Sequence, residues 1–131
     1  DAVVGAMTQA AKGCAALALA PSGVGVFPNA RRARVIWVGI GGQLDRLKSL
    51  QRALEAQLAD LGFPRESRPF KGHLTLGRVK GKIAVHRLQA ALDDLGNFEA
   101  GSFAVDQIIL FKSQLQSSGA VYSRVKQVTL E

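Results

Sequence analysis

The sequence has few of the residues that build disulfides and metal sites. Its 131 residues include one cysteine, Cys14, and two histidines, His73 and His86. A single cysteine excludes an internal disulfide framework, and these three side chains fall short of the four ligands of a structural zinc site. We therefore expect an intracellular, cytoplasmic protein with a reduced cysteine and no bound metal.

Long apolar runs are also absent. No stretch approaches the roughly 18–20 apolar residues that a membrane-spanning helix needs. Cys14–Val26 is apolar, but Pro21, Gly23 and Gly25 interrupt it, and it lacks the flanks of a signal peptide. These features predict no membrane partner. The chain opens with Asp1 rather than methionine, which suggests that a segment precedes it in the natural protein.

Acidic residues are in the minority. Lysine and arginine number 17 against 10 aspartate and glutamate, which gives a net charge of +7 and a pI near 10.2. This balance favours a polyanionic partner, with RNA or DNA ahead of a lipid surface. Apolar residues make up 47% of the chain, which is enough to bury a core, and the length predicts one domain over residues 1–131.

The spacing of apolar residues predicts an α+β fold with a largely antiparallel sheet. Leucines recur every three or four residues over Gln43–Leu61 and Gly62 follows them, which indicates an amphipathic helix. Pro21–Arg34 contains two glycines and ends in arginines, so it is predicted to be a loop with a positive tip. The other expected elements are helices at Val3–Ala11 and Val85–Leu95, a loop at Pro64–Gly72, a turn at Gln116–Gly119, and strands at Cys14–Ala20, Arg34–Ile40, His73–Val79, Phe103–Lys112 and Val121–Leu130.

One predicted strand carries side chains suited to chemistry on a phosphate. Because side chains alternate along a strand, His73 and Thr75 share one face, and Leu74 and Leu76 are expected on the opposite, buried face. An imidazole can move a proton near neutral pH, a hydroxyl can donate to a phosphate oxygen, and Arg78 can pair with the same phosphate. The alternative is the solvated face of an ordinary amphipathic strand. Further basic residues flank this strand at Arg65, Arg68, Lys71, Lys80 and Lys82.

The segment Arg68–Arg78, with the sequence RPFKGHLTLGR, resembles the second signature of the two-histidine phosphoesterases. The matching branch is the bacterial and archaeal 2′-5′ RNA ligase or RNA 2′,3′-cyclic phosphodiesterase family. Further similarity lies, in the order of the family, at Gly25–Asn29, Arg34–Gly39, Leu61–Pro64 and Leu110–Ser113. The resemblance extends over nearly the whole chain.

This resemblance implies two lobes, each with an antiparallel sheet flanked by helices, around a shared cleft. It also implies metal-independent hydrolysis, without a cofactor, of RNA 2′,3′-cyclic phosphate ends to 2′-phosphomonoesters, with 2′-5′ ligation as the reverse direction. The substrates would be tRNA halves or oligonucleotides. By resemblance, His73 would be the general base and Thr75 a phosphate ligand. The further substrate-binding residues would be Arg78, Phe70, Lys71 and Ser113.

The chain departs from the family in its histidines and at one glycine. The family has two His-x-Thr strands, and this sequence has one, because His86 lies in a predicted helix and is expected to be exposed there. Gly72 stands where the family usually has proline. We therefore expect a member that lacks the first His-x-Thr strand of an incomplete first lobe. Such a chain should hydrolyse cyclic phosphates at least ~100-fold more slowly than one with the segment restored, and it should self-associate.

Other interpretations stay open. A non-catalytic RNA-binding module of the same fold is the main alternative, and a small structural or interaction domain is another. Gly39–Gly42 lacks the third glycine of a dinucleotide fingerprint, so a plain turn is favoured there. Cys14 and Trp37 are expected in the core, whereas Phe70 and Tyr122 are better candidates for stacking on a base.

Overall fold

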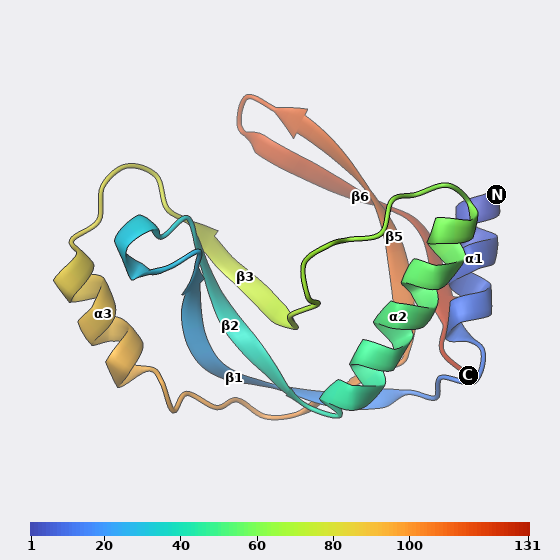
Figure 1. Cartoon of the computed structure of the whole chain (residues 1–131), viewed down its shortest axis with the longest axis horizontal. Coiled ribbons are helices and arrows are strands. Elements are labelled where there is room, and N and C mark those ends of the chain that lie inside the picture. Colours follow the sequence, from blue (N-terminus) through green and yellow to red (C-terminus); the bar gives the residue numbers. More distant parts are fainter. The chain divides into compact units, whose positions relative to one another are not determined.

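The computed structural model describes all 131 residues, and its elements follow the predicted order (Figure 1). The helices are α1 (Ala2–Ala11), α2 (Leu44–Asp60), α3 (Val85–Asp94) and a short 3-10 helix, η1 (Ala30–Arg32). The strands are β1 (Leu17–Phe27), β2 (Val35–Gly42), β3 (His73–Arg78), β4 (Phe103–Val105), β5 (Gln107–Gln116) and β6 (Gly119–Thr129). The strands β1, β2 and β3 pair antiparallel, as do β5 and β6, which confirms the α+β class. None of the helices combines the length and the hydropathy that a bilayer crossing requires.

The chain divides into two compact units. Unit 1 comprises Asp1–Leu17, Asp45–Phe70 and Ala104–Glu131, and unit 2 comprises Ala18–Leu44 and Lys71–Phe103. Apart from single residues at their ends, α1, α2, β5 and β6 therefore belong to unit 1, and β1, β2, β3 and α3 belong to unit 2.

Unit 2 is built on three antiparallel strands in the order β3-β2-β1. Strand β2 pairs on both sides, so Val35 lies beside Phe27 of β1 and beside Arg78 of β3. The centre of β2 buries Val38, and α3 contacts η1 and buries Leu88. Strand β3 lies at the edge of the sheet, so its side chains have a neighbouring strand on one side only and are more exposed to solvent.

Strand β1 is longer than the sequence pattern predicts. The prediction of a loop over Pro21–Arg34 is wrong for Pro21–Phe27, which continues β1 against β2. The register shifts between Ser22 and Val24, and the extra residue there is Gly23, whose φ of +69° suits a glycine. The pairing with β2 satisfies the backbone of a segment that would favour a turn in isolation.

Two other strand boundaries also differ from expectation. The predicted turn at Gly39–Gly42 is wrong, because these residues end β2 in register with β1. Glycine is required at the last of them, where a Cβ on Gly42 (φ +86°) would lie 2.7 Å from the carbonyl oxygen of Ala18. The single strand predicted over Phe103–Lys112 divides into β4 and β5 at Asp106.

Unit 1 packs α1 against the hairpin of β5 and β6. Asp1 caps α1, because its Oδ1 accepts a hydrogen bond of 3.0 Å from the N–H of Val4. The chain turns out of the helix at Gly13, as predicted, where φ is +76°. The residues that α1 buries are mostly small: Ala6, Met7, Ala10 and Ala11. The hairpin reverses through Ser117–Ser118, within the predicted turn.

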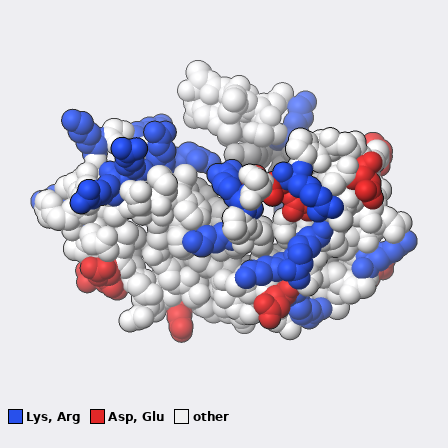
Figure 2. Space-filling model, viewed as in Figure 1, with Lys and Arg blue, Asp and Glu red and all other residues white.

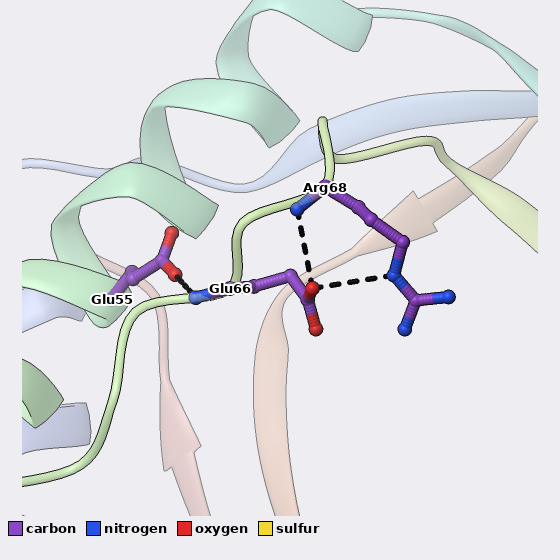
Figure 3. A network of polar contacts seen from close by, with 3 residues as sticks. All are labelled: Glu55, Glu66 and Arg68. Atoms are coloured by element: carbon purple, nitrogen blue, oxygen red, sulfur yellow. Dashed lines mark hydrogen bonds and ion pairs between the residues drawn. The ribbon is translucent and has the colours of Figure 1, made fainter.

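Helix α2 is the helix that the leucine repeat predicts, and it anchors the loop that follows. The N–H of Glu66 donates to Oε1 of Glu55 at 2.6 Å, and the Glu66 carboxylate accepts from the backbone N–H and the Nε–H of Arg68 (Figure 3). These two bonds from Arg68, and then its charge, lower the pKa of the Glu66 carboxyl. One of the basic residues that flank the His-x-Thr strand is therefore already paired with a carboxylate.

Candidate active site

Strand β3 presents the histidine and threonine of the His-x-Thr motif on one face of unit 2. His73 pairs with Gly39, and Thr75 pairs with Trp37. Cross-strand partners in an antiparallel sheet point to the same side, so His73, Thr75 and Trp37 share one face, which we call the site face. Both His73 and Thr75 are exposed. This is the placement that the alternation predicts, whereas the chemical roles of the two residues stay a prediction.

The expected burial of the leucines on the other face of β3 is wrong. Leu74 is 46% exposed and Leu76 is 63% exposed. Leu74 lies opposite Val38, which is buried, but an edge strand has a neighbouring strand on one side only. The alternation of apolar residues therefore predicted correctly that Leu74 lies on the face of buried Val38, but it overestimated how much of the leucine surface is buried.

A β-bulge interrupts the strand at Leu76. Thr75 pairs with Trp37 and Gly77 pairs with Ile36, so β3 advances by two residues where β2 advances by one. The extra residue, Leu76, has no partner in the ladder, which accounts for its exposure. A bulge of this kind also changes the face to which the following side chains point.

The bulge brings Arg78 to the site face. In an unbroken strand Arg78, five residues after His73, would point to the opposite side. In the structure Arg78 pairs with Val35, which is two residues from Trp37 along β2 and so lies on the same face. The predicted phosphate ligand therefore shares a face with His73 and Thr75 because of an irregularity that the sequence pattern does not reveal.

The imidazole of His73 is held by a backbone hydrogen bond. Its Nδ1 lies 2.7 Å from the carbonyl oxygen of Lys71. A carbonyl oxygen can only accept, so the hydrogen of this bond belongs to Nδ1. In the neutral ring Nε2 then carries the free lone pair, which is the atom that can take a proton from water. The hydrogen bond to Lys71 thus fixes which ring nitrogen of His73 is available as a proton acceptor.

Two aromatic rings support this imidazole. The Phe27 ring meets the His73 ring edge to face, with centroids 5.0 Å apart, and the Trp37 centroid lies 6.3 Å from that of His73. Phe27 and Trp37 also contact each other at 5.1 Å. The Nζ of Lys71 lies 5.7 Å and 5.8 Å from the Phe27 and Trp37 centroids, within the range of cation–π attraction. A cation is therefore held beside the candidate base.

The indole of Trp37 lies across Gly25. A Cβ at Gly25 would come within 2.3 Å of the indole, so only glycine leaves room for the ring there. Trp37 is partly exposed rather than buried in the core as expected, and its Nε1 is buried without a hydrogen-bond partner. Sequence reasoning missed the part that Phe27 and Trp37 play in the site. The available signal was a glycine, Gly25, in an otherwise apolar segment, since the indole leaves no room for a Cβ there.

Positive charge is concentrated on unit 2. It carries eight lysine and arginine residues against three aspartate and glutamate residues. Figure 2 shows blue side chains gathered at the end of the view that holds η1 and the loop between β3 and α3. The exposed basic residues of these two segments and of the positions that flank them are Arg31, Arg32, Arg34, Arg78, Lys80 and Lys82. Such a cluster attracts a phosphate-bearing ligand.

The remaining candidates lie elsewhere. Phe70, in the loop after α2, and Ser113, on β5, are both exposed and belong to unit 1, so their part in substrate binding stays a prediction. His86 is exposed on α3, as expected. Cys14 is only partly buried. The structure brings together no group of three or more His, Cys, Asp or Glu side chains that could hold a metal ion.

Comparison with known proteins places the chain in a family. The model of the family described as LigT like Phosphoesterase matches residues 38–122, which include all of β3. The chain belongs to this family. An RNA 2′,3′-cyclic phosphodiesterase of Aeropyrum pernix is 37% identical over 106 residues, which cover 81% of this chain and 60% of the relative. Another from Methanothermobacter thermautotrophicus is 39% identical over 101 residues, covering 77% and 54%.

Solved structures with a similar fold are found as well. TT0787 of Thermus thermophilus superimposes with a TM-score of 0.76 at 23% identity, over 97% of this chain and 67% of that one. LigT of Escherichia coli, crystallised with 3′-AMP, gives a TM-score of 0.68 at 24% identity, over 98% and 68%. The chain spans little more than half the length of the curated relatives it matches. These structures confirm the LigT-like fold that the resemblance implied.

Proposed function

We propose that this protein hydrolyses RNA 2′,3′-cyclic phosphate ends to 2′-phosphomonoesters. The observation that carries the proposal is the site face itself. A histidine with Nδ1 bonded to a carbonyl and Nε2 free stands beside a threonine hydroxyl, and a bulge brings an arginine to the same side. The names of the archaeal relatives support the substrate class.

The reaction begins with removal of a proton from water. Nε2 of His73 accepts that proton, and the resulting hydroxide attacks the phosphorus. The bond from phosphorus to the 3′ oxygen breaks, and the 3′ oxygen gains a proton from a general acid. Thr75 donates a hydrogen bond to a non-bridging oxygen, and Arg78 stabilises the negative charge that develops on the phosphate. If a 5′-hydroxyl takes the place of water, the same attack forms a 2′-5′ phosphodiester, which is the ligation reaction.

The general acid is the open part of this mechanism. The resemblance assigns it to a second His-x-Thr strand, whereas the second histidine of this sequence, His86, lies on a helix. One positioned proton carrier raises the rate of hydrolysis by about 10²–10⁴-fold, and a site without a second carrier lacks the corresponding further increase. We therefore expect slow but measurable turnover that depends on His73.

The test is hydrolysis of a dinucleotide that ends in a 2′,3′-cyclic phosphate, with the product isomer identified by ³¹P NMR. His73→Ala should lower the rate about 10²–10⁴-fold, and Thr75→Val should lower it less. His86→Ala is the matched control and should leave the rate unchanged. Full activity of H73A, or a 3′-phosphate product, would contradict the proposal. RNA binding without any turnover in the unmodified chain would favour the non-catalytic alternative.

A further inference from the structure

The β5–β6 hairpin exposes two aromatic rings and an arginine on one face. Phe111 pairs with Arg124, and two residues further along β5 Ser113 pairs with Tyr122. Paired residues point to the same side and alternate residues share a face, so all four lie on one side of the hairpin, which we call the aromatic face. Phe111 is 50% exposed and Tyr122 is 65% exposed. The hairpin belongs to unit 1, whereas the strands of the site face belong to unit 2.

The charge of the hairpin selects the kind of partner. Gln107–Thr129 contains Lys112, Arg124 and Lys126 and no acidic residue. The hairpin, at the top of Figure 2, shows white and blue atoms and no red. Exposed aromatic rings next to a cation, on a hairpin without acidic residues, can bind a flexible polyanion whose repeating units contain planar aromatic rings. Single-stranded nucleic acid has this chemistry, because bases stack on aromatic rings and phosphates pair with arginine.

A β-bulge places Arg124 and Lys126 on opposite faces of the hairpin. The register shifts between Leu110 and Phe111, so that Leu110 pairs with Lys126 while Phe111 pairs with Arg124. Lys126, two residues after Arg124, therefore points to the opposite side, together with Lys112. The aromatic face thus has one cation, Arg124, directly across from one of its rings.

We infer that the aromatic face of the β5–β6 hairpin binds single-stranded RNA, with bases stacked on Tyr122 and Phe111 and a phosphate on Arg124. The inference rests on the proposed function for the choice of RNA as the polymer. It adds to that function a second contact region, on unit 1, that binds RNA nucleotides.

The experiment measures binding of the full chain to a fluorescent oligouridylate without a cyclic phosphate end, by anisotropy at several salt concentrations. Tyr122→Ala should weaken binding about 5- to 150-fold, and Tyr122→Phe, which keeps the ring, should restore it. Arg124→Glu should also weaken binding and make the slope of log K against log salt shallower by about 0.7. Lys112→Glu is the matched control, since it makes the same charge change on the neighbouring pair of the opposite face.

The outcomes separate this inference from the proposed function. Loss of RNA affinity in Y122A and R124E, with K112E close to the unmodified chain, supports the aromatic face. Equal weakening by K112E and R124E, or unchanged affinity in Y122A, overturns it. Hydrolysis of cytidine 2′,3′-cyclic monophosphate, which has no further nucleotides, should be unchanged in all three variants. Failure of that hydrolysis in the unmodified chain counts against the proposed function alone. Unchanged RNA affinity in Y122A together with a smaller solution mass would assign the face to a second copy of the chain and also overturn the inference.

Discussion

The contact between Gly25 and Trp37 gives the sharpest test of the site face. A Cβ at Gly25 would lie 2.3, 2.5 and 2.8 Å from Cζ2, Cη2 and Cε2 of the indole. Carbon atoms pack best at about 3.5–4.0 Å, so Gly25→Ala requires the ring to retreat by about 1 Å or more. The indole contacts the rings of Phe27 and His73, so its displacement disturbs the support of the candidate base.

The expected cost of Gly25→Ala is that of overpacking, about 1–3 kcal/mol. For a chain of this length each kcal/mol lowers the melting temperature by about 4 °C, so we expect a decrease of about 4–12 °C. Gly77→Ala is the matched control, because Gly77 also lies in a strand of unit 2 and nothing lies within 4 Å of its Cβ position. Both substitutions restrict the unfolded chain equally, so the difference between them isolates the clash.

Thermal unfolding followed by circular dichroism measures this difference. Trp37 is the only tryptophan, so its fluorescence reports directly on the displaced ring. In the background of Trp37→Phe, which replaces the indole by a smaller ring, Gly25→Ala should cost less. Equal melting temperatures of G25A and G77A, together with an unchanged emission spectrum, would refute the placement of the indole over Gly25.

Three further predictions concern packing, the bulge and the loop after α2. Leu88→Ala, at a side chain only 7% exposed, should cost about 2–5 kcal/mol in urea unfolding, whereas Leu76→Ala, at 63% exposure, should stay within about 0.5 kcal/mol. Deletion of Leu76, the extra residue of the bulge, should leave Thr75 opposite Trp37 and Arg78 opposite Val35. Arg78 then stays on the site face and affinity for a mononucleotide should be retained, whereas a loss of affinity with the fold intact by circular dichroism would contradict this register. The Glu66 carboxyl should titrate below its ordinary value of 4.5 by NMR and return toward it in Arg68→Ala. Because that pKa is lowered in the folded chain, any stabilisation from this carboxylate is present above the unfolded pKa and is lost as the pH falls through the folded value.

The sequence by itself determined the elements and the motif. The leucine repeat of α2 and the alternation of β3 are local signals, because periodicity follows from the geometry of a single helix or strand. The same alternation placed His73 and Thr75 on one side of β3 before any partner strand was known. Glycines marked the ends of α1 and α2 for a local reason too, since the backbone there takes a positive φ.

Only the tertiary structure decided which residues meet on the site face. Arg78 reaches that face through a bulge, and a bulge exists only relative to a partner strand, so the pattern of one strand cannot contain it. Phe27 and Trp37 come to His73 from β1 and β2, which lie far before β3 in the sequence, and Gly25, which leaves room for the indole, favours a turn when it is considered alone. Of the loop expected over Pro21–Arg34, the residues Pro21–Phe27 instead form a strand against β2. Pairing with β2 satisfies its backbone N–H and C=O groups, and that stabilisation outweighs a local preference.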